Sequence, residues 1–318
     1  MTRVLLHTDD PDTALEVVTE AHSDLTPAIC EDYEGLEAAL GAYEPEVVYS
    51  CRFSPAPFPR DALLAAPSVR WISNAGSGVN HLMPWDPARI TVTNSAGVAA
   101  EAMAEYALSC FLHFAMDRPG LMADQAARVW RARNVAPLFG RTLLCVGLGK
   151  TGRRMATLGA ALGMRVLGVR ASGSATENVE RVWAPDQMAV PIAAADFVLV
   201  CLPLTDATFG LIGPREFSAM KPGAVYVDIS RGGVTDEAAL IAALKAKRIS
   251  GAALDVFGAE PLPADSPLWS SPRLLISPHC SGLYEGWERR SLAFFVENLT
   301  RWRKGEVLEN VVAAEKGY

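Results

Sequence analysis

The sequence predicts an α/β protein with two doubly wound parallel-sheet domains, and three observations lead to this prediction. Short β-rich runs alternate with helix-length segments, which is typical of parallel strands joined by crossover helices. The chain has 318 residues, which is comfortable for two hydrophobic cores. The alternation occurs twice, on either side of a helical stretch at 99–118 that is apolar around most of its circumference.

The predicted elements follow in chain order. In the first alternation we expect a helix after the first of the strands at 4–7, 46–50, 69–73 and 90–95. In the second we expect helices at 151–162 and 235–247 among strands at 142–146, 165–169, 196–204, 224–230, 251–257 and 274–279. A long amphipathic helix at 285–304 precedes a tail that returns to the first domain. We therefore expect a discontinuous domain, 1–98 plus 285–318, with a second domain, 99–284, inserted into it.

Composition excludes several classes of protein. The formal net charge is −7, whereas a nucleic-acid surface needs a basic face. No apolar run approaches the roughly 18 residues of a membrane span, and the apolar start is too short for a signal peptide. The six cysteines are scattered without metal-ligand spacing, so we expect reduced thiols and no metal. These features favour a cytoplasmic protein, and the apolar stretch at 99–118 suggests a homodimer.

A glycine-rich turn follows the predicted strand at 142–146. Three glycines have the G-x-G-x-x-G spacing of a dinucleotide-binding turn, between a strand and a helix as that motif requires. The first permits a tight turn, the second lets a pyrophosphate approach the backbone, and the third allows close helix packing. The alternative is a plain glycine-rich turn. The expected cofactor-binding residues of this turn are Gly147, Leu148, Gly149, Lys150, Thr151 and Gly152.

The end of the next predicted strand bears on the choice of dinucleotide. An acidic residue would bind the ribose hydroxyls of NAD, but Arg170 stands there and no carboxylate follows before Glu177. A guanidinium pairs well with a 2′-phosphate, and Ser172 offers a hydroxyl to the same group. This pattern favours NADP over NAD. The alternative is a solvent-exposed arginine, with NAD held by backbone contacts.

Three charged residues follow later strands of the same predicted sheet: Arg231, Glu260 and His279. Each alone has a structural interpretation, as an ion pair, a surface carboxylate or a strand-end residue. Together, at the carboxyl edge of a parallel sheet, they suit hydride transfer coupled to proton transfer at a 2-keto acid. Imidazole is a suitable proton donor near neutrality, a carboxylate fixes its tautomer, and a guanidinium binds the substrate carboxylate.

These stretches identify a family resemblance. The motifs "LLCVGLGKTGRRMA", "ADFVLVCLPLTDATFGLI", "KPGAVYVDISRGGVTDEAALIAAL", "GAALDVFGAEPLP" and "LLISPHCSG" resemble those of the D-isomer-specific 2-hydroxyacid dehydrogenases. The resemblance implies a Rossmann-like cofactor domain inserted into a flavodoxin-like substrate domain, with Arg231, Glu260 and His279 as the catalytic set. It also implies that Asp255 binds the nicotinamide carboxamide and that the backbone N–H groups of Ser77 and Gly78 bind the substrate carboxylate.

Four further residues complete the expected site. Arg52, after an early strand, is a candidate for substrate binding because some members carry a basic residue near this position, although a surface arginine is an equal alternative. Leu202, Pro203 and Ile229, at the ends of two strands of the cofactor domain, are expected to contact the cofactor.

The predicted function is the NAD(P)H-dependent reduction of a small 2-keto acid, such as glyoxylate, hydroxypyruvate or a pyruvate-like compound, to the D-2-hydroxy acid. Two alternatives remain open at this point. One is an enzyme like phosphoglycerate dehydrogenase, and the other is a non-catalytic protein that binds and senses the dinucleotide.

Overall fold

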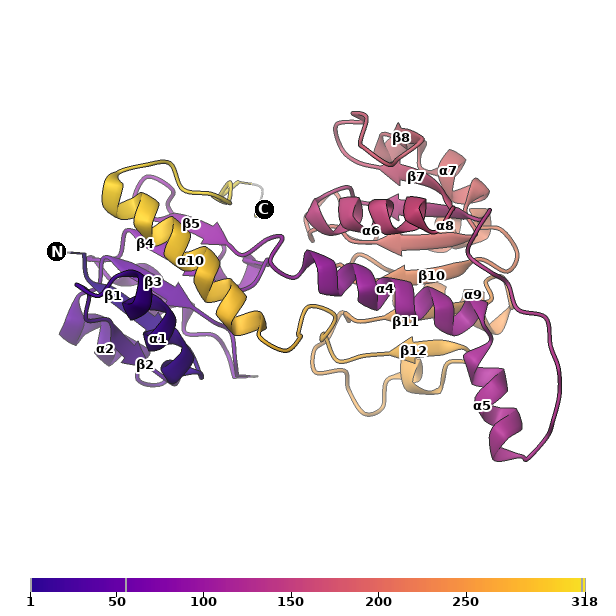
Figure 1. Ribbon diagram of the computed structural model, residues 1–318, viewed down its shortest axis with the longest axis horizontal. Coiled ribbons are helices and arrows are strands. Elements are labelled where there is room, and N and C mark those ends of the chain that lie inside the picture. Colours follow the sequence, from indigo (N-terminus) through magenta and orange to yellow (C-terminus); the bar gives the residue numbers. More distant parts are fainter. Residues whose placement is uncertain (1, 55, 316, 318) are drawn as a thin grey trace. The chain divides into compact units, whose positions relative to one another are not determined.

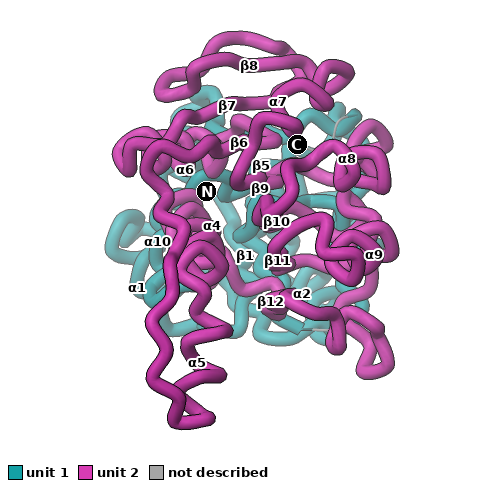
Figure 2. The backbone as a smooth tube through the Cα atoms, turned by 90° about the vertical axis from the view of Figure 1, so that its right-hand side faces the viewer, with its two compact units in different colours: residues 1–98, 284–318 teal, residues 99–283 magenta. Residues whose placement is uncertain are grey.

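The structure is a computed structural model that describes residues 2–54, 56–315 and 317. The chain divides into two compact units, coloured separately in Figure 2. Unit 1 comprises residues 1–98 and 284–318, and unit 2 comprises residues 99–283. Each unit is built around one parallel sheet with helices on both faces (Figure 1). Among the described residues, no helix has the length and apolar character needed to cross a bilayer.

Unit 1 contains five parallel strands in the order β2-β1-β3-β4-β5, which is the flavodoxin-like order. Its strands are β1 (Val4–His7), β2 (Ala28–Cys30), β3 (Val47–Ser50), β4 (Trp71–Asn74) and β5 (Thr91–Asn94). Its helices are α1 (Pro11–Ala21), α2 (Leu36–Tyr43), α3 (Arg60–Ala65) and α10 (Trp287–Lys304). After α10 the tail returns to the sheet, where Thr93 and Val311 form an antiparallel bridge.

Successive side chains of a strand point to opposite sides of this sheet, and helices cover both sides, so both faces are buried. Leu5 and Ile72 belong to a cluster with the apolar residues of α2 and α3. Leu6, Trp71 and Phe295 belong to a second cluster with α1 and α10, which lie side by side in Figure 1. The loops that follow the strands lie at the carboxyl ends of the strands.

Unit 2 contains seven parallel strands in the order β12-β11-β10-β9-β6-β7-β8. The strands are β6 (Thr142–Val146), β7 (Arg165–Val169), β8 (Arg181–Trp183), β9 (Phe197–Val200), β10 (Val225–Asp228), β11 (Gly251–Leu254) and β12 (Leu274–Ile276). The helices are α4 (Ala100–Ala115), α5 (Arg118–Ala126), α6 (Lys150–Ala161), α7 (Ala189–Ala194), α8 (Pro214–Ala219) and α9 (Glu237–Lys245).

Strand order in unit 2 reverses at β6. The chain proceeds from β6 outward to β7 and β8, and then returns to β9 on the other side of β6. Ligands of doubly wound sheets bind at this switch point, beyond the carboxyl ends of the strands. Helices α4 and α6 cover one face of the sheet, and α7, α8 and α9 contribute to the apolar cluster on the other. Unit 2 is therefore doubly wound.

Several predicted strands are shorter than expected. The predicted strand at 196–204 ends at Val200 because its neighbours end in register with it, at Val146 and Asp228. The predicted strands at 251–257 and 274–279 likewise end at Leu254 and Ile276. The residues beyond these points leave the sheet and form loops at the carboxyl edge, where the candidate site residues lie.

The helix expected at 99–118 is present, but it is shorter than predicted. Helix α4 ends at Ala115, Asp117 adopts a left-handed backbone with φ 45°, and α5 begins at Arg118. This break separates the buried helix from α5, which has no buried residue. Sequence reasoning also did not predict the short elements β2, β8, α2, α3, α7 and α8, whose few residues give weak periodic signals.

Candidate active site

The glycine-rich turn joins β6 to α6, as its motif requires. Gly147 has φ 103°, and a Cβ atom there would lie 2.5 Å from the carbonyl oxygen of Cys201. At Gly152 a Cβ atom would lie 2.0 Å from the carbonyl oxygen of Gly147. Both positions therefore require glycine, the first for its backbone conformation and the second for the close approach of the helix to the turn.

Gly149 differs from the other two glycines. A Cβ atom there would meet nothing within 4 Å, so the fold itself makes no steric demand for glycine. Gly149 directly precedes α6 in an extended conformation, and the N-terminus of α6 has no side-chain cap among the described residues. An open backbone at an uncapped helix N-terminus fits a pyrophosphate, which needs N–H donors and close approach.

The other predicted residues of this region lie around the same turn. Leu148 is buried, Lys150 is exposed, and the Thr151 hydroxyl contacts the sulfur of Met103. The Leu202 side chain lies 3.0 Å from the position that a Cβ atom of Gly147 would take. Further from the turn, the carbonyl of Pro203 accepts a hydrogen bond from Thr208, and Ile229 is buried after β10.

Arg170 follows β7, directly beside the glycine-rich turn. The N–H of Gly147 donates to the carbonyl of Val169, and Arg170 is the next residue. No carboxylate among the described residues lies within ion-pair distance of its guanidinium, whose Nη1 donates to the hydroxyl of Thr176 at 3.5 Å. Ser172 is exposed, with its hydroxyl 2.7 Å from that of Ser174. A guanidinium and several hydroxyl groups thus lie on the segment after β7, where the sequence predicts a contact with a 2′-phosphate.

Three neighbouring strands deliver the expected catalytic residues. Arg231 follows β10, Glu260 follows β11 and His279 follows β12, and these strands are adjacent and parallel. The turn carrying Arg231 also packs tightly against the loop before Glu260. A Cβ atom at Gly232 would lie 1.7 Å from the carbonyl oxygen of Phe257. Residues distant along the chain therefore meet at one edge of unit 2.

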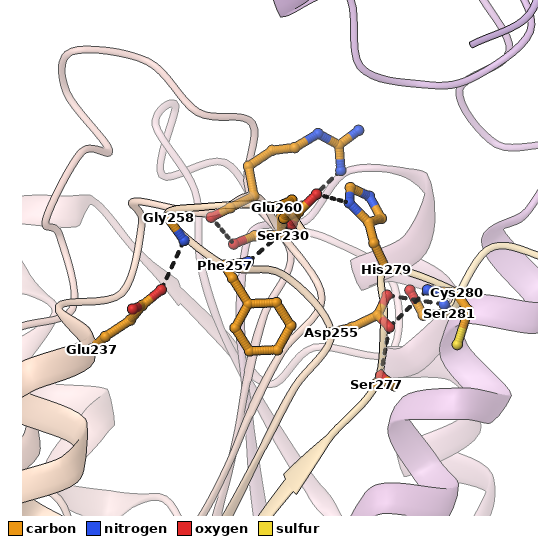
Figure 3. A network of polar contacts seen from close by, with 11 residues as sticks. Ser230, Glu237, Asp255, Phe257, Gly258, Glu260, Ser277, His279, Cys280 and Ser281 are labelled. Carbon is orange, nitrogen blue, oxygen red and sulfur yellow. Dashed lines mark hydrogen bonds and ion pairs between the residues drawn. The ribbon is translucent and has the colours of Figure 1, made fainter. Parts of the chain in front are cut away.

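His279 and Glu260 form a hydrogen-bonded pair (Figure 3). Nδ1 of His279 lies 2.8 Å from Oε2 of Glu260, and Oε1 of Glu260 accepts from the backbone N–H of Phe257 at 2.9 Å. Burial alone would raise the pKa of the Glu260 carboxyl, but these hydrogen bonds and the charges of His279 and Arg231 hold it below its ordinary value. The side chain of His279 is 44% exposed, so a ligand can reach the imidazole.

Arg231 is a partly buried cation at the same edge of the sheet. Its Nη1 donates to the carbonyl of Ser230 at 2.6 Å, and no carboxylate among the described residues lies within 4.0 Å of its guanidinium. Burial lowers the pKa of Arg231, while the negative charges of Glu260, Asp228 and Asp255 act in the opposite direction. A desolvated guanidinium of this kind favours an anionic ligand with two oxygens.

The carboxylate of Asp255 is occupied within unit 2. It is 1% exposed, Oδ1 accepts from the Ser277 hydroxyl and the N–H of Cys280, and Oδ2 accepts from the N–H of Ser281. Figure 3 shows Asp255 pointing toward this loop. The role of Asp255 in binding the nicotinamide stays a prediction.

In unit 1 the expected substrate-binding residues follow adjacent strands. Arg52 follows β3 and is exposed, and Ser77 and Gly78 follow β4. Asn94 donates to the carbonyl of Ser77 at 2.8 Å, and Asn74 donates to that of Gly78 at 3.1 Å. The N–H groups of Ser77 and Gly78 donate to no backbone carbonyl among the described residues. These amides remain available as donors.

Sequence reasoning missed the residues that support the site. Asp228 is buried at the end of β10 and accepts hydrogen bonds from the N–H of Ser230 and from the Thr235 hydroxyl, so it fixes the turn that carries Arg231. Glu237 accepts from the N–H of Gly258 at 2.7 Å and fixes the loop before Glu260. An aspartate at the end of an apolar strand, as in "VYVDIS", is the signal that could have indicated Asp228.

No metal site accompanies these residues. In the part of the chain that the structure describes, no group of three or more His, Cys, Asp or Glu side chains forms a possible metal centre. The described cysteines carry no disulfide, and all six are free thiols.

The chain is similar to known proteins along most of its length. The sequence model of the D-isomer specific 2-hydroxyacid dehydrogenase NAD-binding domain matches residues 108–281. A glyoxylate reductase of Korarchaeum cryptofilum is 31% identical over 271 residues, covering 81% of this chain and 80% of the relative. A D-3-phosphoglycerate dehydrogenase of Methanocaldococcus jannaschii is 31% identical over 261 residues, covering 80% of this chain and 49% of the relative.

Solved structures extend the comparison to the whole chain. A D-isomer specific 2-hydroxyacid dehydrogenase from Xanthobacter autotrophicus Py2, in complex with NADPH and MES, has a TM-score of 0.87 and 29% sequence identity. The alignment covers 100% of each chain. These matches, together with the glycine-rich turn and the strand-end residues, show that the chain belongs to the D-isomer specific 2-hydroxyacid dehydrogenase family.

Proposed function

We propose that this protein reduces a small 2-keto acid, of the glyoxylate or hydroxypyruvate class, to the D-2-hydroxy acid with NADPH in preference to NADH. The observation that carries the proposal is the 2.8 Å pair of His279 Nδ1 and Glu260 Oε2, together with the Arg231 guanidinium, which has no carboxylate of the described residues within 4.0 Å. These groups provide a proton donor and an anion-binding group at the same edge of the sheet as the dinucleotide-binding turn.

His279 acts as the general acid in this proposal. Because Nδ1 is bonded to Glu260, the proton is transferred from Nε2 to the carbonyl oxygen of the substrate. The carboxylate of Glu260 is fixed from the other side by the N–H of Phe257, so it holds the imidazole ring in one orientation.

Arg231 binds the substrate carboxylate. The guanidinium can offer two N–H groups to two oxygens, and binding there places the adjacent carbonyl beside His279. We propose that Arg52 and the N–H groups of Ser77 and Gly78 also bind the substrate, with unit 1 serving as the substrate domain. In support, these amides donate to no described backbone carbonyl.

Unit 2 serves as the cofactor domain. The six residues from Gly147 to Gly152 would hold the pyrophosphate, and Leu202, Pro203, Ile229 and Asp255 would contact the rest of the cofactor. When bound, the reduced nicotinamide supplies the hydride. Arg170 and Ser172 would bind the 2′-phosphate, together with Thr176, whose hydroxyl accepts a hydrogen bond from Arg170. This arrangement supports the preference for NADPH.

The function is tested by mixing the protein with glyoxylate, hydroxypyruvate, pyruvate or a bulkier 2-keto acid, with NADPH and NADH in turn. We expect loss of absorbance at about 340 nm, fastest with NADPH, and near-complete loss of turnover in His279→Ala with cofactor binding retained. Oxidation of 3-phosphoglycerate without reduction of any simple keto acid would favour the phosphoglycerate dehydrogenase alternative. Cofactor binding without turnover of any of these compounds would favour a sensor.

A homodimer is part of the proposal. Helix α5 and the segment after it extend away from the sheet in Figure 1, and α5 has no buried residue. Met122, Trp130 and Phe139 are exposed apolar side chains of this region, which favours a protein partner. We expect light scattering to give a dimer for the native chain and a monomer for Trp130→Asp. Val190→Asp, at another exposed apolar site of unit 2, is the matched control and should leave the dimer intact.

We propose a cytoplasmic location. The six cysteines carry no disulfide, which is typical of a reducing compartment. Fractionation of cells that express the protein tests this, and recovery outside the cytoplasm would contradict it.

A further inference from the structure

The segment that carries His279 has an unusual backbone. His279 adopts φ 52°, in the left-handed region that residues with a Cβ atom rarely occupy. Such a conformation costs about 1 kcal/mol or more, so it persists only where the surroundings fix it. The question is which groups fix it here.

Asp255 is the group around which this segment is folded. The N–H groups of Cys280 and Ser281, the two residues after His279, both donate to its carboxylate, at 2.9 Å each. Successive N–H groups converge on one anion where the backbone passes through the left-handed region. The Ser277 hydroxyl, two residues before His279, donates to Oδ1 at 2.5 Å. Both flanks of His279 are therefore tied to one buried carboxylate.

Tyr106 extends this arrangement to helix α4. Its phenolic oxygen is hydrogen-bonded to the Ser277 hydroxyl, which lies 171 residues away in sequence. Burial raises the pKa of Tyr106, so the phenol keeps its proton. Because the Ser277 proton is given to the Asp255 carboxylate, which only accepts, the Tyr106 O–H must donate to Ser277. The result is a directed chain from the phenol through the hydroxyl to the carboxylate.

We propose that Tyr106, Ser277 and Asp255 are positioning residues that hold the His279 imidazole against Glu260. This inference rests on the proposed function of His279 as the proton donor. It assigns Asp255 a role in the unliganded protein, and it assigns Tyr106 a role that its position in the apolar helix α4 did not indicate.

The first test is spectroscopic and needs neither cofactor nor substrate. In protein labelled with 15N-histidine, we expect the Nδ1 proton of His279, hydrogen-bonded to Glu260, to give a downfield signal, which His279→Ala assigns. We expect this signal to broaden or disappear in Tyr106→Phe, which keeps the ring and removes only the hydroxyl. Tyr43→Phe is the matched control, since it removes a hydroxyl that donates to Thr26 in unit 1, and the signal should persist.

The second test is kinetic. We expect Tyr106→Phe to lower kcat about ten-fold, the size of one lost hydrogen bond to a charged network, with cofactor affinity and KM little changed. Added to His279→Ala, the same change should have no further effect, because it acts through the imidazole. Ser277→Ala should reproduce the effect of Tyr106→Phe.

The outcomes separate this inference from the alternatives. If Tyr106→Phe and Ser277→Ala leave both the Nδ1 signal and kcat unchanged, the positioning role is wrong. If Asp255→Asn weakens dinucleotide binding and leaves the signal intact, Asp255 acts only on the cofactor. If the protein reduces no keto acid but the signal still depends on Tyr106, the positioning holds and the proposed function fails.

Discussion

Replacing Glu260 by glutamine is the sharpest test of the acid–base pair. The Glu260 carboxylate serves two donors at once, Nδ1 of His279 at 2.8 Å and the N–H of Phe257 at 2.9 Å. A glutamine has one acceptor oxygen at its end, and its NH2 group can only donate. At least one of these two hydrogen bonds must therefore be lost, and the one that remains is no longer assisted by charge.

The size of the effect follows from these contacts. A hydrogen bond to a charged group contributes about 1.5–3 kcal/mol, compared with about 0.5–1.5 kcal/mol for a neutral one. The exposed fractions are 44% for His279 and 33% for Glu260, so solvent screens the difference and the lower part of the range applies. A loss of about 1.4 kcal/mol corresponds to a ten-fold change in rate. We expect kcat for keto-acid reduction to fall about ten-fold in Glu260→Gln.

Glu180→Gln is the control, because Glu180 is an exposed carboxylate of unit 2 that pairs with Arg165, and this change should leave kcat unaltered. An unchanged kcat in Glu260→Gln would refute the proposed role of the pair.

Three further changes test other parts of the site. Arg170→Asp should weaken NADPH binding by about ten-fold or more in fluorescence titrations while affecting NADH far less, and equal losses would contradict a 2′-phosphate contact. Gly149→Ala should preserve the melting temperature yet weaken dinucleotide binding. Gly152→Ala, whose Cβ atom would lie 2.0 Å from a carbonyl oxygen, should lower both the melting temperature and the affinity for the dinucleotide. A stable Gly152→Ala protein would argue against the described turn. The stability difference between the native chain and Glu260→Gln should be present above the ordinary carboxyl pKa of 4.5 and disappear as the pH falls through the lowered pKa of Glu260, and denaturant unfolding at several pH values should detect it.

Much of the fold is predictable because its signals are local. Buried parallel strands are short apolar runs, and the runs at 142–146 and 165–169 coincide with β6 and β7. The glycine turn is also local, since the conformation of Gly147 is required within the turn itself. The boundary at Val200 was not predictable, because a strand ends where its partners end, and those partners are distant in sequence.

The sequence by itself determined which chemical groups the protein holds and that each follows a strand of a parallel sheet. The tertiary structure alone decided how those groups meet. Strand order places Glu260 against His279, 19 residues later, and leaves the Arg231 guanidinium without a carboxylate within 4.0 Å among the described residues. It also brings Tyr106 to Ser277 across 171 residues. Side-chain contacts of this kind depend on which strands and helices become neighbours, and that arrangement is a property of the whole core rather than of any short stretch.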